Sequence, residues 1–326
     1  MEAEQRTEPG GRQAGALAGA SLVQVVLYVR DPAASRSFYE GVLGLVPAQG
    51  GEGAATYATG QARLSLRPAA DGGVTPGTPD TTADVTFLVP HLDSVRDALA
   101  ARGVEFTETQ RYVIGATAGF LDPDGHQLSL YEPSATAMTW PSGGKIRALL
   151  RAAGRDPARY GAGRPPPGAA PAGLGEGTLV YLFLFVPHPE PAIAFYHRLL
   201  GFSYLECRPC RCGGAEHPQG VVKYDAGGVL LTTHYLEGPK AEAAGPLEPA
   251  RMKALSAVFR VDDVERVVAE LGARGVRTGP VSPSAGGRTA WFEDPFGRVF
   301  HLLQPSPAMA DAPVGAAPAE ILSGAF

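Results

Sequence analysis

Large apolar residues occur at alternate positions early in the first half of the chain. Val25, Leu27 and Val29 recur at every second position, which is the period of a β-strand. The segment 32–43 follows with helical spacing, and Gly44 is a typical helix stop. The pattern therefore predicts a strand followed by a helix.

Short apolar segments after this helix predict further strands, and the same order of elements then begins again. In the second helix Leu92, Val95 and Leu99 share one face, as expected of an amphipathic helix. The first half is interpreted as strand, helix and three strands, used twice. Its further elements are predicted as strands at 56–58, 63–67, 84–89, 104–107, 117–121 and 127–131 and a helix at 92–102.

The second half of the chain repeats the first. VRDPAASRSFYEGVLGL at 29–45 returns as VPHPEPAIAFYHRLLGF at 186–202, and FLDPDGHQLSL at 120–130 returns as FEDPFGRVFHL at 292–302. Such repetition indicates one structural plan used again, so the predicted fold class is α+β, with four βαβββ modules in two tandem eight-stranded units. The second half is expected to have strands at 179–186, 201–206, 221–224, 229–234, 257–261, 276–278, 290–293 and 299–303.

Composition indicates which terminal segments are flexible and which classes of partner are not expected. The chain has 326 residues and a net charge of −5 at pH 7, so no overall basic field attracts nucleic acid or an anionic membrane. Residues 1–20 and 306–326 have few large apolar groups and are expected to be flexible tails. The N-terminus lacks the apolar run of a signal peptide or membrane anchor, and the expected location is cytoplasmic.

A Pro/Gly/Ala-rich linker is predicted at 134–176, between the two halves. Within it KIRALLRAAGR at 145–155 has helical spacing and is basic. Two interpretations are open: a solvated linker helix, which we prefer, or a helix that docks against a domain or an acidic partner.

Three short motifs recur in a fixed order. They are V-x-D at 29–31, FYxxxLG at 38–44 and DPDG at 122–125. In this order they resemble the vicinal oxygen chelate superfamily, which includes glyoxalase I, bleomycin-resistance proteins and extradiol dioxygenases. The resemblance covers 21–133 and 177–305, and implies two cup-shaped units with these boundaries.

The resemblance also implies metal-ligand positions on inward-facing strands, where family metalloenzymes place His, Gln or Glu. Neither unit of this chain offers three strong ligands, so no cofactor is expected. The alternative hypothesis, that the protein is an enzyme, would need Fe, Mn, Ni or Zn at a displaced site. By strand alternation the positions are Gln24, Ser65, Asp84 and Ser129 in the first unit and Tyr181, Thr232, Ser256 and His301 in the second.

The second unit is predicted to hold the main ligand pocket. An aromatic wall with a few polar groups suits a flat organic molecule. His301 beside Tyr181 would be a catalytic acid–base pair, or both would simply line the cup with hydrogen bonds to their neighbours. The residues expected around this one hollow, besides Tyr181 and His301, are Phe183, Phe185, Thr232, His234, Ser256 and Arg260.

The first cup is predicted to be more polar. Arg63 and Arg67 alternate onto the same face as Ser65. Two inward guanidinium groups would suit a carboxylate or a phosphate, although one or both arginines at the rim, reaching solvent, fit the pattern equally well.

All three cysteines lie in one short segment. Cys207, Cys210, Cys212 and His217 have a spacing that would allow a four-ligand zinc site. The usual zinc knuckle has two separated pairs, and we prefer a loop without a bound metal.

The function that follows is metal-independent binding of a small organic molecule in a cup, as in bleomycin-resistance-type proteins. The alternative is a lyase, isomerase or dioxygenase in which His234 and His301 join a carboxylate such as Glu293. A homodimer is compatible with the resemblance, because superfamily members often dimerise.

Overall fold

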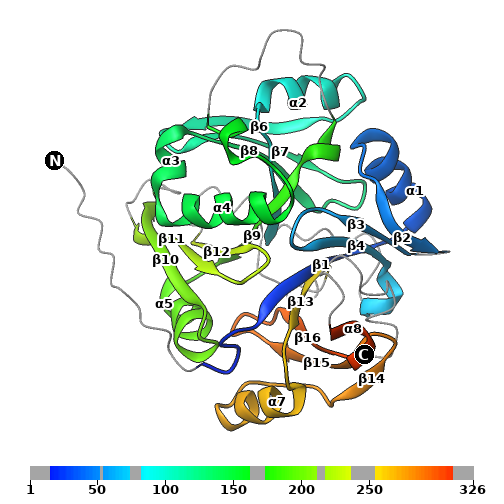
Figure 1. Ribbon diagram of the computed structural model, residues 1–326, viewed down its shortest axis with the longest axis vertical. Coiled ribbons are helices and arrows are strands. Elements are labelled where there is room, and N and C mark those ends of the chain that lie inside the picture. Colours follow the sequence, from blue (N-terminus) through cyan, green and yellow to red (C-terminus); the bar gives the residue numbers. More distant parts are fainter. Residues whose placement is uncertain are drawn as a thin grey trace.

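The structure is a computed structural model and describes residues 15–51, 54–73, 82–161, 173–210, 217–235 and 254–310. Within these ranges the predicted order of strand, helix and three strands occurs four times (Figure 1). The fold class is confirmed as α+β, with two eight-stranded sheets and helices. No described helix is long and apolar enough to span a bilayer.

The first two modules keep the predicted order of elements, but the strand Pro47–Gly51 was not predicted and the strand Phe106–Tyr112 extends beyond the predicted 104–107. Asp31 caps the first helix by accepting hydrogen bonds from the backbone of Ala33 and Ala34, and Pro32 fits the first helical position. Module one contains β1 (Ser21–Val29), α1 (Pro32–Arg36), η1 (Ser37–Val42), β2 (Pro47–Gly51), β3 (Ala54–Ala58) and β4 (Arg63–Pro68), and η2 (Ala69–Gly72) follows it. Module two contains β5 (Ala83–Leu88), α2 (Leu92–Ala100), β6 (Phe106–Tyr112), β7 (Gly115–Leu121) and β8 (Gln127–Pro133).

The other two modules repeat this arrangement after a connecting segment. That segment contains α3 (Ala135–Thr139), α4 (Pro141–Ala152), η3 (Pro157–Arg159) and η4 (Leu174–Glu176). Module three contains β9 (Thr178–Val186), α5 (Pro189–Ile193), η5 (Ala194–Leu199), β10 (Ser203–Cys210), β11 (His217–Asp225) and β12 (Leu230–Tyr235). Module four contains β13 (Leu255–Arg260), α7 (Val264–Ala273), β14 (Ser282–Ser284), β15 (Gly287–Glu293) and β16 (Val299–Pro305), and α8 (Pro307–Ala310) follows it.

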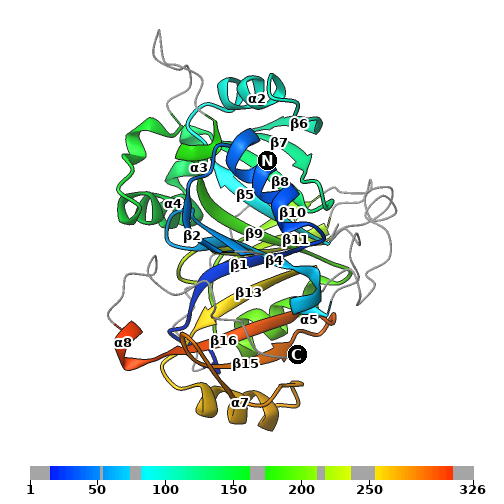
Figure 2. The same cartoon turned by 90° about the vertical axis from the view of Figure 1, so that its right-hand side faces the viewer.

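The modules do not pair in the order in which they follow one another. Sheet A has the order β14-β15-β16-β13-β1-β4-β3-β2 and joins modules one and four, whereas sheet B has the order β10-β11-β12-β9-β5-β8-β7-β6 and joins modules two and three (Figure 2). The expectation that Gln24, Ser65, Asp84 and Ser129 share one cup was therefore wrong. All four opening strands have the same pattern, so strand alternation could not say which of them pair. In the structure β5 pairs with β9, and β1 pairs with β13.

A single large apolar core joins both sheets to their helices. Alternate residues of the opening strands enter it, for example Val25 and Leu27 of β1 and Leu182 and Leu184 of β9. The helices α1, α2, α5 and α7 lie against strands of their own modules. The side chains that alternate with these core residues are thereby left to form a second face on each sheet.

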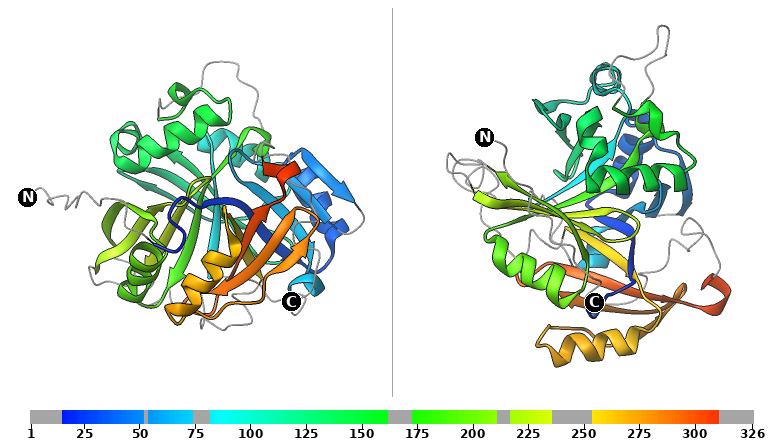
Figure 3. Two further views of the ribbon diagram at one scale, coloured as in Figure 1. Left: turned by 60° about the horizontal axis from the view of Figure 1, so that its bottom comes forward. Right: turned by 60° about the vertical axis from the view of Figure 1, so that its left-hand side comes forward.

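The connecting helix α4 docks on sheet B, so the preferred interpretation of a solvated linker helix was wrong. Ile146 and Leu150 are 1 % and 0 % exposed and pack in one cluster with Tyr181 of β9. Figure 3 shows α4 and α5 on opposite sides of the strands β9–β12. The apolar spacing of the helix was visible in the sequence, but the surface that receives it comes from strands far along the chain.

The recurrent motifs link modules to one another. The hydroxyl of Tyr39, from FYxxxLG, donates to the carboxylate of Asp122, from the DPDG turn, at 2.9 Å. In the second half Tyr196 donates to Asp294 at 2.6 Å. Each of these buried bonds joins the helix of one module to the last turn of the next, which explains why the two motifs recur together.

The residue after each turn reaches across to the other sheet. His126 lies 2.9 Å from Asp122 through Nδ1 and 3.1 Å from the backbone oxygen of Ala254 through Nε2. Its counterpart Arg298 donates to the backbone oxygens of Thr82 and Phe185 at 2.6 and 2.7 Å. Each of these two residues therefore ties the turn of its own sheet to the backbone of the other sheet.

Candidate functional site

Each sheet has an inner face, made of the residues that alternate with those in the large core. In sheet A this face carries a small separate apolar cluster that includes Val26, Tyr28 and Val258. Polar side chains surround the cluster on the same face. We define the inner face of sheet A as Gln24, Arg63, Ser65, Arg67, Ser256, Arg260 and His301.

Strand register brings the polar residues of two distant modules together. Val26 of β1 is paired with Ser65 of β4 on one side and with Ser256 of β13 on the other. His301 of β16 is paired with Val258, next along the inner face from Ser256. Residues from both ends of the chain therefore form one surface.

The hydroxyl groups of this face are already engaged in hydrogen bonds. Gln24 donates through Nε2 to Ser65 Oγ at 2.6 Å, and Ser65 Oγ lies 2.8 Å from Thr56 Oγ1. Ser256 donates to the backbone oxygen of Val299 at 2.7 Å. These bonds orient Gln24 and engage the hydroxyl groups of Ser65 and Ser256.

The inner face of sheet A is rich in positive charge. Arg63 and Arg67 are 3 % and 6 % exposed, and Arg260 is half-buried on the neighbouring side of β1. Burial lowers the pKa of Arg63, which nevertheless remains a cation near neutrality. Burial also raises the pKa of Tyr28, and the charge of Arg67 partly opposes that rise.

His301 is the buried imidazole of this face. Burial lowers its pKa to about 4, because the charged form loses its hydration. At neutral pH the ring is therefore uncharged, so it can both donate and accept a hydrogen bond.

The inner face of sheet B is aromatic. Ring centroids lie 5.9 Å apart for Tyr131 and Tyr181, 5.3 Å for Tyr181 and Phe183, and 6.4 Å for Phe183 and His234. Phe185 continues the row, 5.8 Å from His234. The predicted aromatic wall is thus present on β9.

The same face holds a buried carboxylate. Asp84 accepts hydrogen bonds from Ser129 at 2.6 Å, Gln127 at 3.2 Å and Thr86 at 3.2 Å. Burial raises the pKa of Asp84 to about 6, although these three donors act in the opposite direction. The carboxylate is thus held by its own sheet, and Thr232 shares its face from β12.

An ion pair beneath α4 was not predicted from the sequence. Lys223 and Glu206 lie 2.8 Å apart with side chains only 7 % and 9 % exposed. Lys223 also donates to Ser142 of α4 at 3.3 Å and lies 5.3 Å from the ring of Tyr181, while the backbone amide of Ser142 donates to Glu206. The alternation of side chains along β11 could have indicated the position of Lys223, because it puts this residue on the same face as its register partner Thr232.

The predicted second-unit pocket is divided between the two sheets. Tyr181 belongs to sheet B and His301 to sheet A, so the structure does not form the predicted acid–base pair. Ser256 and Arg260 likewise join sheet A, whereas Phe183, Phe185, Thr232 and His234 remain with Tyr181. The cause is again the pairing of modules. Each of these residues lies on the inner side of its strand, as strand alternation predicted, but the strands belong to two different sheets.

The residues of the displaced metal site, which the alternative enzyme hypothesis requires, do not come together either. His234 lies on sheet B, whereas His301 and Glu293 lie on sheet A. Glu293 is paired with Arg277 at 2.7 Å. Across the described ranges no group of three or more His, Cys, Asp or Glu side chains could hold a metal ion.

The residues at the family's metal positions do not fit a divalent cation. In sheet A the four positions hold Gln24, Ser65, Ser256 and His301, and both serine hydroxyls serve the hydrogen bonds described above. In sheet B the set is Asp84, Ser129, Tyr181 and Thr232, with a single carboxylate already bound by three donors. A chelated ion needs several converging imidazole or carboxylate ligands, and each set supplies too few.

The cysteine cluster lies mostly outside the described side chains. Cys207 is half-buried, and burial raises the pKa of its thiol. Cys210 and His217 are register partners where β10 meets β11, and Cys212 lies outside the described residues. The zinc hypothesis for Cys207, Cys210, Cys212 and His217 stays a prediction.

Comparison with known proteins agrees with this architecture. A family model for the Glyoxalase/Bleomycin resistance protein/Dioxygenase superfamily matches residues 21–130 and 178–302. A Mycobacterium bovis protein named "Putative glyoxylase CFP32" is 24 % identical over 299 residues, which are 87 % of this chain and 94 % of that protein.

Two solved structures have a similar fold over most of their length. Glyoxalase I from Zea mays has a TM-score of 0.53 at 16 % identity, covering 87 % of this chain and 92 % of its own. A "putative dioxygenase" from Bacillus subtilis has a TM-score of 0.54 at 14 % identity, covering 91 % of this chain and 89 % of its own. At these identities the similarity concerns the fold alone.

Proposed function

Because the chain belongs to the Glyoxalase/Bleomycin resistance protein/Dioxygenase superfamily, we propose that it binds a small organic anion on the inner face of sheet A without a chelated metal. The observation that carries this proposal is that three guanidinium groups, those of Arg63, Arg67 and Arg260, share that face. Guanidinium groups bind carboxylates and phosphates through paired hydrogen bonds.

Two modules supply the three cations. Arg63 and Arg67 come from β4, next to β1, and Arg260 comes from β13 on the other side of β1. By register Arg63 and Arg67 lie beside Gln24 and Tyr28, and Arg260 lies beside Ser21 near the start of β1. The cations therefore follow the length of β1, and an anionic group would pair with the arginine nearest to it. The apolar cluster that includes Val26 and Val258 lies between the arginines and would accept the uncharged body of the ligand.

Neutral polar groups supply the remaining specificity. Gln24 is held by the hydrogen bond that its Nε2 donates to Ser65. Its amide oxygen is therefore also held in one orientation. His301 is uncharged at neutral pH because burial lowers its pKa to about 4, so it would orient a ligand by hydrogen bonding and would add no charge.

Sheet B is the less suitable face for a ligand of this size. Its centre already packs against the connecting segment, since Ile146 and Leu150 of α4 contact the cluster that contains Tyr181. The half-buried residues Phe183, Phe185 and His234 lie further along β9 and β12. We therefore assign the primary site to sheet A and keep the aromatic row of sheet B as a secondary ligand surface.

The test is a binding screen with matched anions and neutral compounds. Benzoate, salicylate and phenyl phosphate would be titrated into the full chain by calorimetry, with benzamide as the uncharged counterpart. We expect saturable binding of at least one anion, and Arg67→Gln should weaken it about tenfold or more, because an oriented charge-assisted pair is lost.

The exposed residue Arg111, which pairs with Asp93, provides the matched control. Arg111→Gln removes the same charge and should leave affinity within twofold. Added Mg²⁺, Mn²⁺, Ni²⁺ or Zn²⁺ should not change the affinity. Equal losses in Arg67→Gln and Arg111→Gln, or binding that requires a metal, would refute the proposal.

A further inference from the structure

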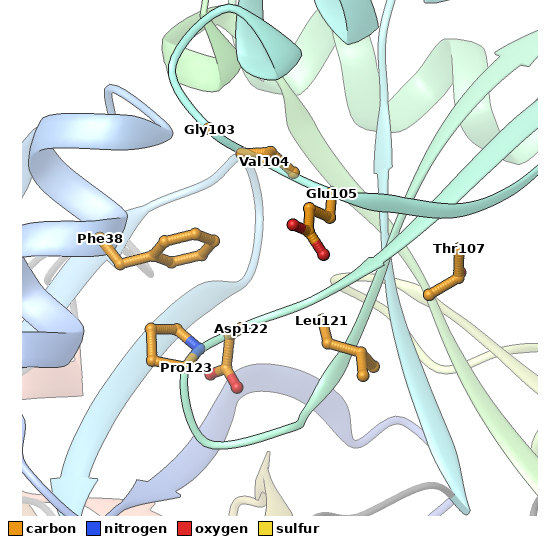
Figure 4. Close-up of a pocket in the computed structure, with 8 residues that line it drawn as sticks. All are labelled: Phe38, Gly103, Val104, Glu105, Thr107, Leu121, Asp122 and Pro123. Atoms are coloured by element: carbon orange, nitrogen blue, oxygen red, sulfur yellow. The ribbon is translucent and has the colours of Figure 1, made fainter.

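A cavity of about 300 Å³ lies between the helix of module one and the edge of module two. By register Leu121 is paired with Gln127, at the edge of the inner face of sheet B, whereas none of the lining residues belongs to the inner face of sheet A. Its size is at the lower end for small-molecule pockets. Its lining consists of Phe38, Gly103, Val104, Glu105, Thr107, Leu121, Asp122 and Pro123 (Figure 4).

Most of the cavity wall is apolar. Phe38, Val104 and Pro123 border it, and Leu121 presents a side chain that is 47 % exposed. An exposed leucine at the edge of an apolar cavity leaves surface that a ligand could cover. The cavity would therefore favour an apolar or aromatic body.

One carboxylate is free to meet a ligand there. Glu105 projects into the space between Phe38 and Leu121 (Figure 4), and it forms no ion pair with another residue in the described ranges. The second acid of the wall, Asp122, is already used, because it accepts hydrogen bonds from Tyr39, His126 and two backbone amides.

The second half of the chain shows what occupies the equivalent place. The segment from Val104 to Asp122 corresponds to that from Val276 to Asp294, so Arg277 stands for Glu105 and Glu293 for Leu121. Arg277 and Glu293 form an ion pair at 2.7 Å.

The same arginine also lies over an aromatic ring. The guanidinium of Arg277 is 5.5 Å from the centroid of Trp291, within the range of a cation–π contact. The second half therefore carries its own cation beside a carboxylate and an aromatic group. The first half keeps a carboxylate and apolar walls but has no cation of its own at the corresponding residue.

We propose that the Glu105 cavity binds a small organic cation with an apolar or aromatic body, such as an amidinium, guanidinium or primary ammonium compound. The charged head pairs with the carboxylate of Glu105, as Arg277 pairs with Glu293. The body lies against Phe38 and Leu121. Charge and shape together set the ligand class, because neither an anion nor a strongly hydrated inorganic cation matches both.

The test is an NMR titration of the ¹⁵N-labelled full chain with benzamidinium, using benzamide as the uncharged isostere. The amides of Val104, Glu105 and Leu121 are expected to shift saturably with benzamidinium. Benzamide should bind at least fivefold more weakly, because it cannot form the ion pair.

Two variants separate local recognition from general electrostatics. Glu105→Gln should weaken benzamidinium binding at least fivefold, whereas Glu108→Gln on β6, which does not line the cavity, should change it less than twofold. Glu105 is exposed, so its variant is expected to keep the wild-type spectrum elsewhere. Equal effects of the two variants, equal binding of benzamide, or shifts confined to other residues would overturn the proposal.

Discussion

Sheet A and sheet B are built from equivalent modules, but their inner faces differ in charge and in what packs on them. Sheet A carries three arginines and the neutral His301, whereas sheet B carries the carboxylate of Asp84 and a row of aromatic rings. On sheet B the helix α4 contributes Ile146 and Leu150 to the cluster around Tyr181. The comparison shows that the connecting segment packs on part of the inner face of sheet B, whereas the inner face of sheet A carries cations and neutral polar groups.

The largest effect is expected from a variant that disrupts the packing of α4 on sheet B. Leu150→Asp would place a carboxylate at a fully buried position, and should reduce the free energy of unfolding by more than about 4 kcal/mol or prevent folding. Urea denaturation followed by circular dichroism measures the change.

The next residue on the same helix gives the control. Arg151 is exposed, so Arg151→Asp should cost less than about 1 kcal/mol. If the two aspartates had similar effects, α4 would not be a structural part of sheet B, and that face would be a rival ligand site.

A smaller loss is expected from breaking the buried ion pair beneath α4. Glu206→Ala removes the partner of Lys223, which lies 2.8 Å away and is almost fully buried. Leaving that ammonium buried without its carboxylate should cost about 3–5 kcal/mol. The double variant Glu206→Leu/Lys223→Met should recover most of this loss in the same urea assay.

An exposed pair provides the reference. Arg266 and Glu270 are 55 % and 35 % exposed, so Glu270→Ala should cost less than about 1 kcal/mol. Additive effects of Glu206→Ala and Lys223→Met would contradict the energetic coupling between Glu206 and Lys223.

The sequence contained enough information for the modules and for side-chain parity, but not for the pairing of modules. Apolar alternation correctly placed Gln24, Ser65 and His301 on inner faces, because a strand has only two sides. Pairing depends on which opening strands meet edge to edge, and β1, β5, β9 and β13 have the same pattern. The division of Tyr181 and His301 between two sheets was therefore beyond the reach of alternation.

The contacts of the connecting segment were also out of reach. The spacing of Ile146 and Leu150 predicts an amphipathic helix, but the apolar surface that buries them is completed by Tyr181, from a strand that follows in the chain. Lys223 is another case, because a lysine in a strand is usually exposed and its partner Glu206 lies across a bulged register.

The inner faces should also respond to pH in opposite ways, and His301 governs the response of sheet A. Burial lowers its pKa to about 4, against about 6.5 in an unfolded chain. Between pH 6.5 and 4 the unfolded state binds more protons, so stability that is fully present above pH 6.5 is lost as the pH falls. From pH 7 to 4 the wild type should lose about 3 kcal/mol relative to His301→Gln.

Urea denaturation at pH 4, 5, 6 and 7 gives this difference directly. His188→Gln changes an exposed histidine and should leave the pH profile of the wild type unchanged. Parallel profiles for the wild type and His301→Gln would mean that the ring of His301 is solvated, and sheet A would then have an open inner face.

Asp84 gives sheet B a response of the opposite sign and slightly smaller size. Burial raises its pKa to about 6, against about 3.9 when unfolded, so between these values the folded state binds more protons. Stability is fully present below about pH 4 and is lost as the pH rises through 6, by about 2–3 kcal/mol relative to Asp84→Asn. Asp262→Asn, at an exposed position, should show no such difference.

The two opposing terms largely cancel in the wild type between pH 4 and 6, which is why single variants are needed to see either one. Asp84→Asn should leave stability that rises with pH in this window, and His301→Gln should leave stability that falls. In the double variant the contributions of both groups are absent, so its profile should lie parallel to that of the wild type. If both single variants shifted the profile in the same direction, the two buried groups would have like rather than opposite linkage, and the contrast between a neutral imidazole on sheet A and a buried acid on sheet B would be wrong.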